Sequence, residues 1–360
     1  MRTLAEAYDP RRNNFDFLRF ALAGLVLWSH SYSLADVQDP LRRLTGELEG
    51  GRLGVEGFFV VSGFLVTQSR ERSSGTAVFA AKRALRVFPA LIAALVFSAF
   101  VVAPMASTRT AADYFGWGRP WLVFVGVFLH RYLSIPGTFS HNAFPNHVNA
   151  SLWTLRYELT CYVLVAVLGV LATRLRAGAT AVVLVLSCVL ALTGPEKGWF
   201  GDARYWLPHL AAYFTAGMLL YQLRAVVPYT GWAMGLAVIG IGAGLAIGRT
   251  EAVLPIFGSY LLLVAACTPR LPLAGFGQRG DVSYGLYVYA YPIQQLVLHV
   301  AGGSTDPLRV LAVSFPATLA IAALSWRFIE APALARKPRS SPDASPAQGR
   351  TGWNHRQSAK

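Results

Sequence analysis

Long apolar segments without a polar face are the feature that most restricts how this chain can fold. Examples are LIAALVFSAFVVAPM (91–105) and ATAVVLVLSCVLAL (179–192). An α-helix needs roughly 20 apolar residues to cross about 30 Å of hydrocarbon. Charged residues make up 14% of the chain, whereas soluble domains usually carry about 25%. The sequence therefore predicts an all-α, polytopic membrane protein.

The apolar segments predict about ten transmembrane helices. We expect them at 15–34, 54–69, 84–104, 151–172, 178–194, 206–223, 231–248, 252–268, 282–301 and 308–329. The apolar stretch within 119–133 is too short to cross, and we expect it to lie at the interface or to re-enter the membrane. The domain boundaries follow: a cytoplasmic head at 1–14, a transmembrane domain at 15–332, and a disordered, basic, cytoplasmic tail at 333–360.

The net charge of +14 has a simple explanation in such a protein. Arginine and lysine concentrate in the loops and the tail that would lie inside if the N-terminus does, as the positive-inside rule requires. We therefore expect a multi-pass protein of the cell membrane with both termini cytoplasmic, and no nucleic-acid partner. Cys161, Cys188 and Cys267 fall in apolar segments without metal-ligand spacing, so no metal site is expected.

The first predicted span, RFALAGLVLWSH (19–30), carries one ionisable group at each end. Eleven residues at 100° each bring Arg19 and His30 to one face of a helix, about 16 Å apart along its axis. Ionisable groups inside spans usually face the protein interior. The pair therefore predicts a stripe that lines a path through the membrane. The alternatives are an Arg19 side chain extended to the inner interface and a structural hydrogen bond at His30.

Two further segments carry charged residues into predicted spans. Glu56 opens the second span at the depth of His30, where it could orient that histidine as the carboxylate does in histidine-based acyl transfer. Alternatively, it is stabilised by the dipole of its own helix N-terminus. Arg83 and Arg86 are helix neighbours at the inner face and form a fork suited to phosphate, or else they anchor the helix at the interface.

The entry to the fourth span is unusually polar. The segment NASLWTLRYELTCY (149–162) brings Trp153, Arg156 and Glu158 to the start of a membrane helix. Arg156 and Glu158 are two residues apart and do not face each other on a helix. Each therefore requires a partner elsewhere, and we expect these residues to contact substrate or to stabilise an oxyanion.

Taken in order, these segments resemble the acyltransferase-3 family of membrane acyltransferases. Arg19 and His30 match its Arg–ten residues–His signature, and Arg83 and Arg86 match its Arg-x-x-Arg element. The segments GVEGFFVVSGFLV (54–66), SLWTLRYELTCY (151–162), SYGLYVYAYPIQQ (283–295) and FIEAP (328–332) also resemble family motifs. One departure is Ala290, which stands where the family often has histidine.

The resemblance implies an O-acyltransferase that moves an acyl group, acetyl in the commonest case, from cytoplasmic acyl-coenzyme A (acyl-CoA) to a hydroxyl of a carbohydrate or glycosylated acceptor. The helices would surround an internal acyl-CoA channel. Acyl-CoA would be a co-substrate bound by Arg19, Arg83 and Arg86, and no resident cofactor is expected. His30 would act as general base and Glu56 would orient it, while Arg19 or Arg156 meets the developing oxyanion.

A second class of function uses the same residues differently. Histidine, glutamate and arginine inside spans could form a proton relay in a proton-coupled transporter or a lipid-linked sugar flippase. The chain shows no internal repeat of the kind that many transporters have, and a flippase has no need of a phosphate-binding arginine pair.

Overall fold

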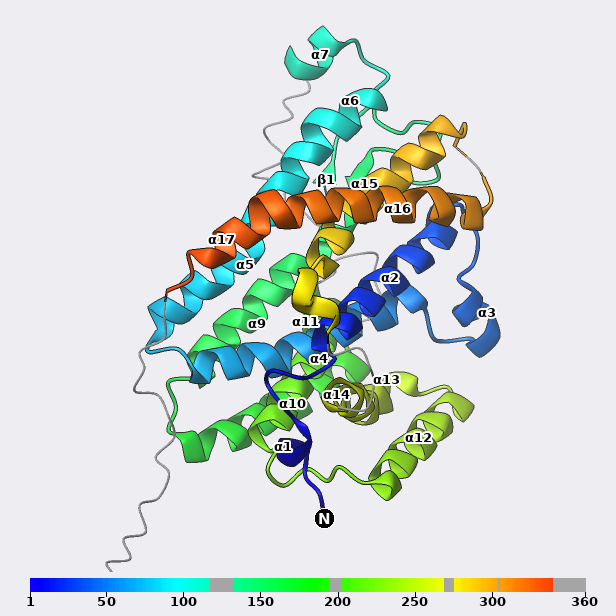
Figure 1. Cartoon of the computed structure of the whole chain (residues 1–360). Helices are drawn as coiled ribbons and strands as arrows, with labels where there is room; N and C mark the ends of the chain where they lie inside the picture. Colours follow the sequence, from blue (N-terminus) through cyan, green and yellow to red (C-terminus); the bar gives the residue numbers. More distant parts are fainter. Residues whose placement is uncertain (117–132, 195–202, 269–274, 304, 339–360) are drawn as a thin grey trace, which may run out of the picture.

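The computed structural model describes residues 1–116, 133–194, 203–268, 275–303 and 305–338. These residues are mostly helical (Figure 1), because a chain buried in lipid must satisfy its backbone hydrogen bonds within each segment. The described strands are one short antiparallel pair, β1 (Leu133–Ser134) and β2 (His147–Asn149). The all-α prediction is confirmed. The helical elements are α1 (Leu4–Ala7), α2 (Phe15–Leu34), α3 (Pro40–Thr45), α4 (Gly50–Glu71), α5 (Thr76–Phe97), η1 (Ser98–Val102), α6 (Ala103–Met105), α7 (Ala111–Gly116), η2 (Ala150–Thr154), α9 (Leu155–Leu168), α10 (Thr173–Thr193), α11 (Ala203–Gln222), α12 (Gly231–Ala246), α13 (Thr250–Val253), η3 (Leu254–Gly258), α14 (Ser259–Cys267), η4 (Phe276–Arg279), α15 (Ser283–Val300), α16 (Pro307–Ser325), η5 (Trp326–Glu330) and α17 (Ala331–Ala335).

Each of the ten predicted spans coincides with a helix or with a run of consecutive helical elements. By length and composition, five helical segments of the described chain could cross a membrane: Thr76–Met105, Ala150–Leu168, Thr173–Thr193, Thr250–Cys267 and Pro307–Ala335. The helix Gly231–Ala246 is apolar but shorter. The remaining crossings stay predictions. The re-entrant segment predicted within 119–133 lies outside the described residues, apart from its last position.

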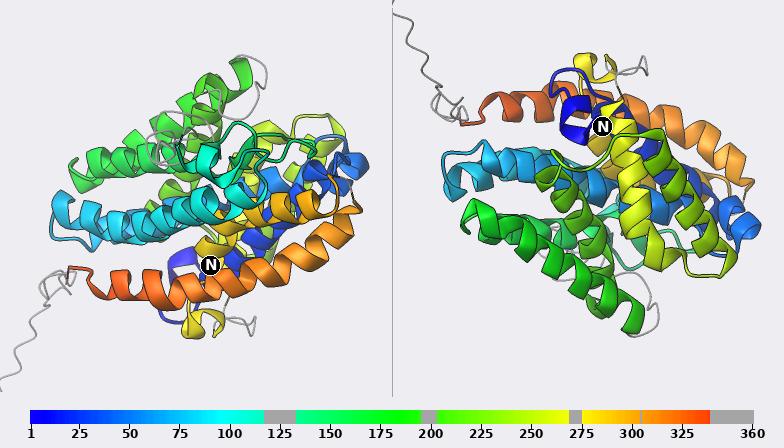
Figure 2. Two further views of the ribbon diagram at one scale, coloured as in Figure 1. Left: turned by 90° about the horizontal axis from the view of Figure 1, so that it is seen from above. Right: turned by 90° about the horizontal axis from the view of Figure 1, so that it is seen from below.

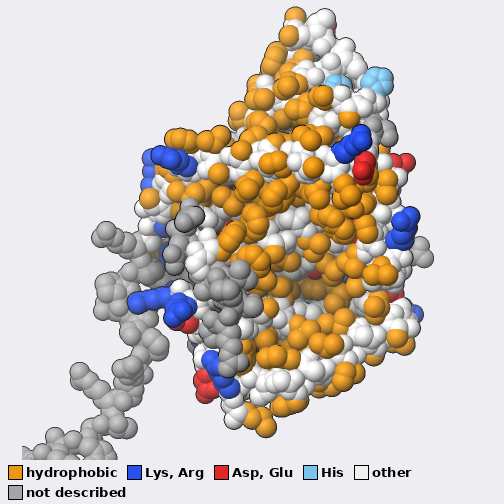
Figure 3. Space-filling model, turned by 45° about the vertical axis from the view of Figure 1, so that its right-hand side comes forward, with side chains coloured by type: hydrophobic (Ala, Val, Ile, Leu, Met, Phe, Trp, Pro, Cys, Tyr) orange, Lys and Arg blue, Asp and Glu red, His pale blue; other side chains and the backbone are white. Residues whose placement is uncertain are grey.

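The outer helices present apolar side chains at the surface. Helix α5 lies between α10 on one side and α16 on the other (Figure 2). On α10 the buried side chains are those of Thr180 and Ser187, whereas Val182, Val185 and Leu186 are more than half exposed. Hydrophobic side chains also cover much of the face in Figure 3, with Lys and Arg near its margins. Such a surface suits lipid and not water, as expected of a multi-pass membrane protein.

Helix α4 packs between α2 and α11 in the middle of the molecule. Its contact with α11 depends on two glycines. A Cβ atom on Gly63 would lie 2.0 Å from the backbone oxygen of Phe214, and one on Gly217 would lie 2.1 Å from that of Val60. Glycines permit this approach because they place no side chain between the two backbones. The position of α4 is therefore fixed closely against α11.

The two ends of the chain are attached to this bundle over the residues that the structure describes. In the head, Leu4 is fully buried, and the side-chain amide of Asn14 donates to the backbone oxygens of Ala265 and Thr268 at 3.0 and 2.7 Å. At the other end α17 continues to Ala335, beyond position 333 where the sequence predicts a disordered tail. Residues 339–360 of that tail lie outside the described residues.

Candidate active site

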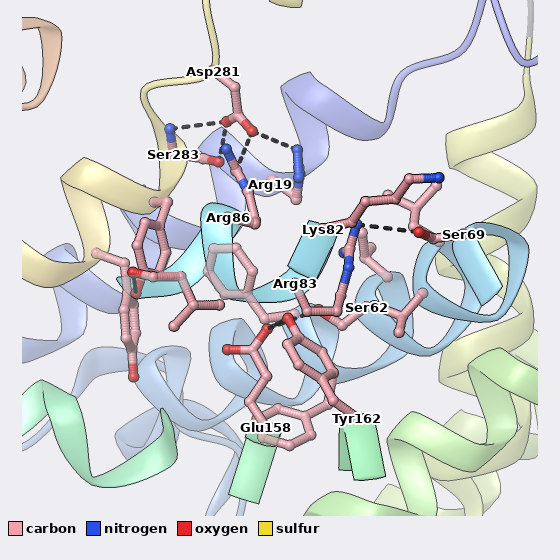
Figure 4. Close-up of a pocket in the computed structure, with 18 of the residues that line it drawn as sticks. Arg19, Ser62, Ser69, Lys82, Arg83, Arg86, Glu158, Tyr162, Asp281 and Ser283 are labelled. Carbon is pink, nitrogen blue, oxygen red and sulfur yellow. Dashed lines mark hydrogen bonds and ion pairs between the residues drawn. The ribbon is translucent and has the colours of Figure 1, made fainter. Parts of the chain in front are cut away.

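A cavity of about 510 Å³ lies between α2, α4, α5, α9 and α15, and its wall is completed by η5, α17 and the segment after α17. One part of the wall is apolar, formed by side chains such as Phe58, Phe59 and Leu155. The other part is charged (Figure 4). The basic residues of the wall are Arg19, Arg72, Lys82, Arg83, Arg86 and Lys337, and its acidic residues are Glu158 and Asp281. We call this space the cationic cavity, since its lining carries a surplus of positive charge.

Asp281 neutralises part of this charge. It precedes α15, and its Oδ1 accepts hydrogen bonds from the backbone and hydroxyl of Ser283 at the helix start. Its Oδ2 accepts from Arg19 at 2.5 Å and from Arg86. Burial alone would raise the pKa of Asp281, but the two guanidinium groups hold that pKa below its usual range. One carboxylate thus joins α2, α5 and α15.

Arg83 is held differently from Arg86, although the two were predicted to form one phosphate fork. Arg86 lies against Asp281 and 3.9 Å from a carboxylate oxygen of Glu330. Arg83 donates from Nη2 to the hydroxyl of Ser69 at 3.3 Å, and its Nε is buried without a partner. Among the described residues no carboxylate lies within ion-pair distance of Arg83. The two neighbours therefore differ in how much positive charge they can offer a ligand.

Of the three residues predicted at the entry to α9, Glu158 is the one that lines the cationic cavity. Its carboxylate accepts hydrogen bonds from the hydroxyls of Tyr162 and Ser62 (Figure 4). Trp153 instead packs against Trp206, with ring centroids 4.7 Å apart. Arg156 stacks over the ring of Tyr157 at 4.6 Å. Neither Trp153 nor Arg156 is in the cavity wall, and their predicted roles remain predictions.

His30 lies beyond the apolar part of the cavity and is not in its wall. Between Arg19 and His30, the same stripe of α2 carries Ala23 and Val26, which are buried. The imidazole meets the ring of Tyr291 edge-on at 5.5 Å, one helical turn beyond Tyr287 of the cavity wall. Its Nδ1 is buried and has no hydrogen-bond partner in the described part of the chain. Arg19 and His30 thus lie on one face of α2, as predicted, but Arg19 is the α2 residue in the cavity wall, and a path along this face to His30 stays a prediction.

The structure does not bring Glu56 to His30. Glu56 is 3% exposed, and its carboxylate accepts from Arg52 Nε at 2.7 Å and meets His209 Nε2 at 2.8 Å. Arg52 in turn binds Glu251 at 3.0 Å. The predicted orienting contact is therefore wrong in this structure, because Arg52 of α4 and His209 of α11 already occupy the carboxylate. A catalytic part for Glu56 itself stays a prediction.

Sequence reasoning missed Asp281, Lys337 and His209. The local pattern Asp-x-Ser before an apolar segment does predict a helix cap at Asp281. Its pairing with Arg19 and Arg86 spans 262 and 195 residues, and no local pattern reports such a contact. Lys337 falls in the tail that composition predicts, and His209 belongs to none of the motifs that the sequence analysis singles out.

The apolar surface, the helical bundle and the comparisons with known proteins together define a multi-pass membrane acyltransferase. The family described as "Acyltransferase domain" matches residues 12–327, and the chain belongs to this acyltransferase-3 family. The match contains the segments quoted above up to Arg327, so the resemblance seen in the sequence is confirmed.

Two characterised relatives match along nearly the whole chain. It is 30% identical over 357 residues to "Nodulation protein 10" of Rhizobium leguminosarum bv. viciae, covering 91% of this chain and 95% of that protein. It is 28% identical over 347 residues to the "O-acetyl transferase" of Shigella phage Sf6, covering 93% and 99%. No solved structure matches the chain significantly.

Proposed function

We propose that this enzyme is an O-acyltransferase of the cell membrane that transfers an acyl group, acetyl in our proposal, from cytoplasmic acyl-CoA to a hydroxyl of a carbohydrate or glycoconjugate. The observation that carries the proposal is the cationic cavity, whose wall runs from basic residues such as Arg19 to Tyr287, one helical turn before the Tyr291 ring that His30 contacts. The name of the phage relative, an O-acetyl transferase, supports the choice of acetyl and of a hydroxyl acceptor.

The charge of the cavity fits a phosphate-bearing donor. Phosphate groups bind best to arginine and lysine side chains, which line the cavity where the loops predicted to be cytoplasmic meet the bundle. The pantetheine arm of the donor is narrow and largely uncharged, and the apolar part of the wall suits it. In this arrangement the nucleotide stays at the inner face while the thioester extends toward His30.

In the proposed reaction His30 is the general base. The neutral imidazole accepts the proton of the acceptor hydroxyl, and the hydroxyl oxygen attacks the thioester carbonyl carbon. The carbon–sulfur bond then breaks, coenzyme A leaves as the thiolate, and it takes up a proton. General base catalysis of this kind typically contributes about 10²–10⁴-fold to the rate. Arg19 is not placed to meet the oxyanion, since it lies about 16 Å from His30 along the helix axis and binds Asp281.

Mass spectrometry of envelope glycans tests the proposal. Cells with the gene should carry O-acyl groups that cells without it lack, and His30→Ala should remove them while purified protein still binds coenzyme A. His299→Ala is a matched control, because this second histidine packs edge-on against Phe139. Full transfer by His30→Ala would remove His30 from the mechanism, and identical glycans with and without the gene would refute the proposed function.

A covalent route through His30 is separable by trapping. Incubation with labelled acyl-CoA and no acceptor would leave label on His30 if an acyl-histidine forms. Direct transfer, which we favour, predicts that no label remains on the protein.

A further inference from the structure

The last described residues of the chain form part of the cationic cavity. Helix α17 packs against α5, and the segment from α17 onward contributes Leu334 and Lys337 to the wall. Both residues lie beyond position 327, where the family match ends. The charged end of this cavity is therefore completed by a segment for which the family match makes no prediction.

Lys337 is a cation without a counterion in the described part of the chain. Arg19 and Arg86 share Asp281, whereas no carboxylate of the described residues lies within ion-pair distance of Lys337. Burial, followed by the charges of Arg83, Arg86, Arg19 and Lys82, lowers the pKa of Lys337 to about 8. A half-buried ammonium beside four like charges is costly without an anion, and it indicates a place where an anionic ligand binds.

We propose that Lys337 and Arg83 together bind a phosphate group of the acyl-CoA donor. The inference rests on the proposed function and adds a donor-binding residue to it. Arg83 offers a guanidinium without a carboxylate partner among the described residues, and Lys337 adds a compact ammonium from the segment after α17. Two cations from separate elements would hold the phosphate at the end of the cavity away from His30, which leaves the long axis of the cavity to the pantetheine arm.

Binding of coenzyme A to the full-length protein in phosphatidylcholine nanodiscs tests this inference. We expect Lys337→Gln to weaken binding about tenfold or more, as for a lost hydrogen bond to a charged group, and Lys337→Arg to keep most of it. Arg336→Gln removes the same charge from the adjacent exposed residue and should change binding less than about twofold. Equal affinities of the Lys337→Gln and Arg336→Gln proteins would overturn the inference.

Donors without phosphate show whether Lys337 acts through that group. Acetyl-pantetheine lacks every phosphate, so the Lys337→Gln and unchanged proteins should use it equally well. If Lys337→Gln used acetyl-pantetheine less well than the unchanged protein, Lys337 would act by shaping the cavity. That result would overturn the inference.

A lipid headgroup is the other source of a phosphate group that could bind Lys337 and Arg83. If phosphatidylglycerol in the nanodisc competes with coenzyme A in the unchanged protein but not in Lys337→Gln, the site belongs to lipid and the inference is wrong. The proposed function fails separately, when the unchanged protein neither binds coenzyme A nor transfers an acyl group.

Discussion

Two groups of charged side chains lie along α4, and they are balanced in different ways. Near the start of the helix, Arg52 and Glu56 form a set of pairs with His209 and Glu251, which we call the paired set. Toward its end, the cationic cavity has six basic residues in its wall but two acidic ones. Buried charges that pair with one another hold helices together, whereas a surplus of one sign is a site for a ligand of the other sign.

The largest expected effect concerns the paired set. Glu56→Gln leaves Arg52 and His209 without the carboxylate that they share, and breaking a buried ion pair typically costs about 3–5 kcal/mol. Thermal unfolding in detergent should show a decrease of this order in the free energy of unfolding. Glu49→Gln, which removes the partner of Arg42 in an exposed pair, should cost less than about 1 kcal/mol. Unchanged stability with lost transfer in Glu56→Gln would instead restore Glu56 to the catalytic role that the sequence predicts.

Removing a cation from the cationic cavity should instead weaken coenzyme A binding without lowering stability. Arg83→Gln removes a cation that has no carboxylate partner, so stability should stay the same or rise while coenzyme A binding falls about 10–100-fold. Isothermal titration and thermal unfolding of one preparation measure both quantities. Arg174→Gln, an exposed residue of α10, should alter neither. A destabilised Arg83→Gln with normal binding would erase the distinction between the two groups.

Asp281 shares features of both groups, because it is paired with two arginines and also lines the cationic cavity. Asp281→Asn should lower the unfolding temperature and, by removing a negative charge near the ligand, raise the affinity for pyrophosphate by about 1 kcal/mol or roughly fivefold. Asp16→Asn, the more exposed partner of Arg19, should have a smaller effect on both measurements. Weaker pyrophosphate binding by Asp281→Asn would mean that Asp281 positions Arg19 and Arg86 for the ligand.

The last expected effect, no larger than that of Asp281→Asn, is a dependence of acetyl-CoA binding on pH. Lys337 faces Arg19 of α2 and Lys82, Arg83 and Arg86 of α5, and the carboxylates of the same wall are Glu158 and Asp281. With a pKa of about 8 in the empty protein, Lys337 is protonated at pH 7 and mostly neutral at pH 9.

A bound phosphate would raise the pKa of Lys337, so binding takes up protons and the affinity should fall about fivefold between these pH values. Titrations of Lys337→Arg supply the control. Because arginine stays charged, the affinity of this variant for acetyl-CoA should not change between pH 7 and pH 9. An equal slope in Lys337→Arg would assign the effect to another group.

The sequence predicted the helices better than their polar contacts. Lipid as a solvent forces each apolar segment into a helix with internal hydrogen bonds, so the positions of the helices follow from local composition. The shared face of Arg19 and His30 also follows, because one regular helix fixes it.

Contacts between helices depend on packing that no local pattern reports. Glu56 was matched to His30 by depth alone, but the close contact of α4 with α11 at Gly63 and Gly217 brings His209 to it instead. Lys337 was assigned by the composition of its surroundings to a disordered tail. It belongs to the cavity because α17 prolongs the last long helix along α5.

The contact between Gly63 and Gly217 also bears on which acyl groups the enzyme accepts. Ser62, the residue before Gly63, lines the cavity, so the same helix forms its wall on one side and rests on α11 with almost no space on the other. A methyl group added at Gly63 would push this wall inward and narrow the route that we propose for the thioester. Chain-length preference in this enzyme should therefore be sensitive to a residue that never touches the substrate.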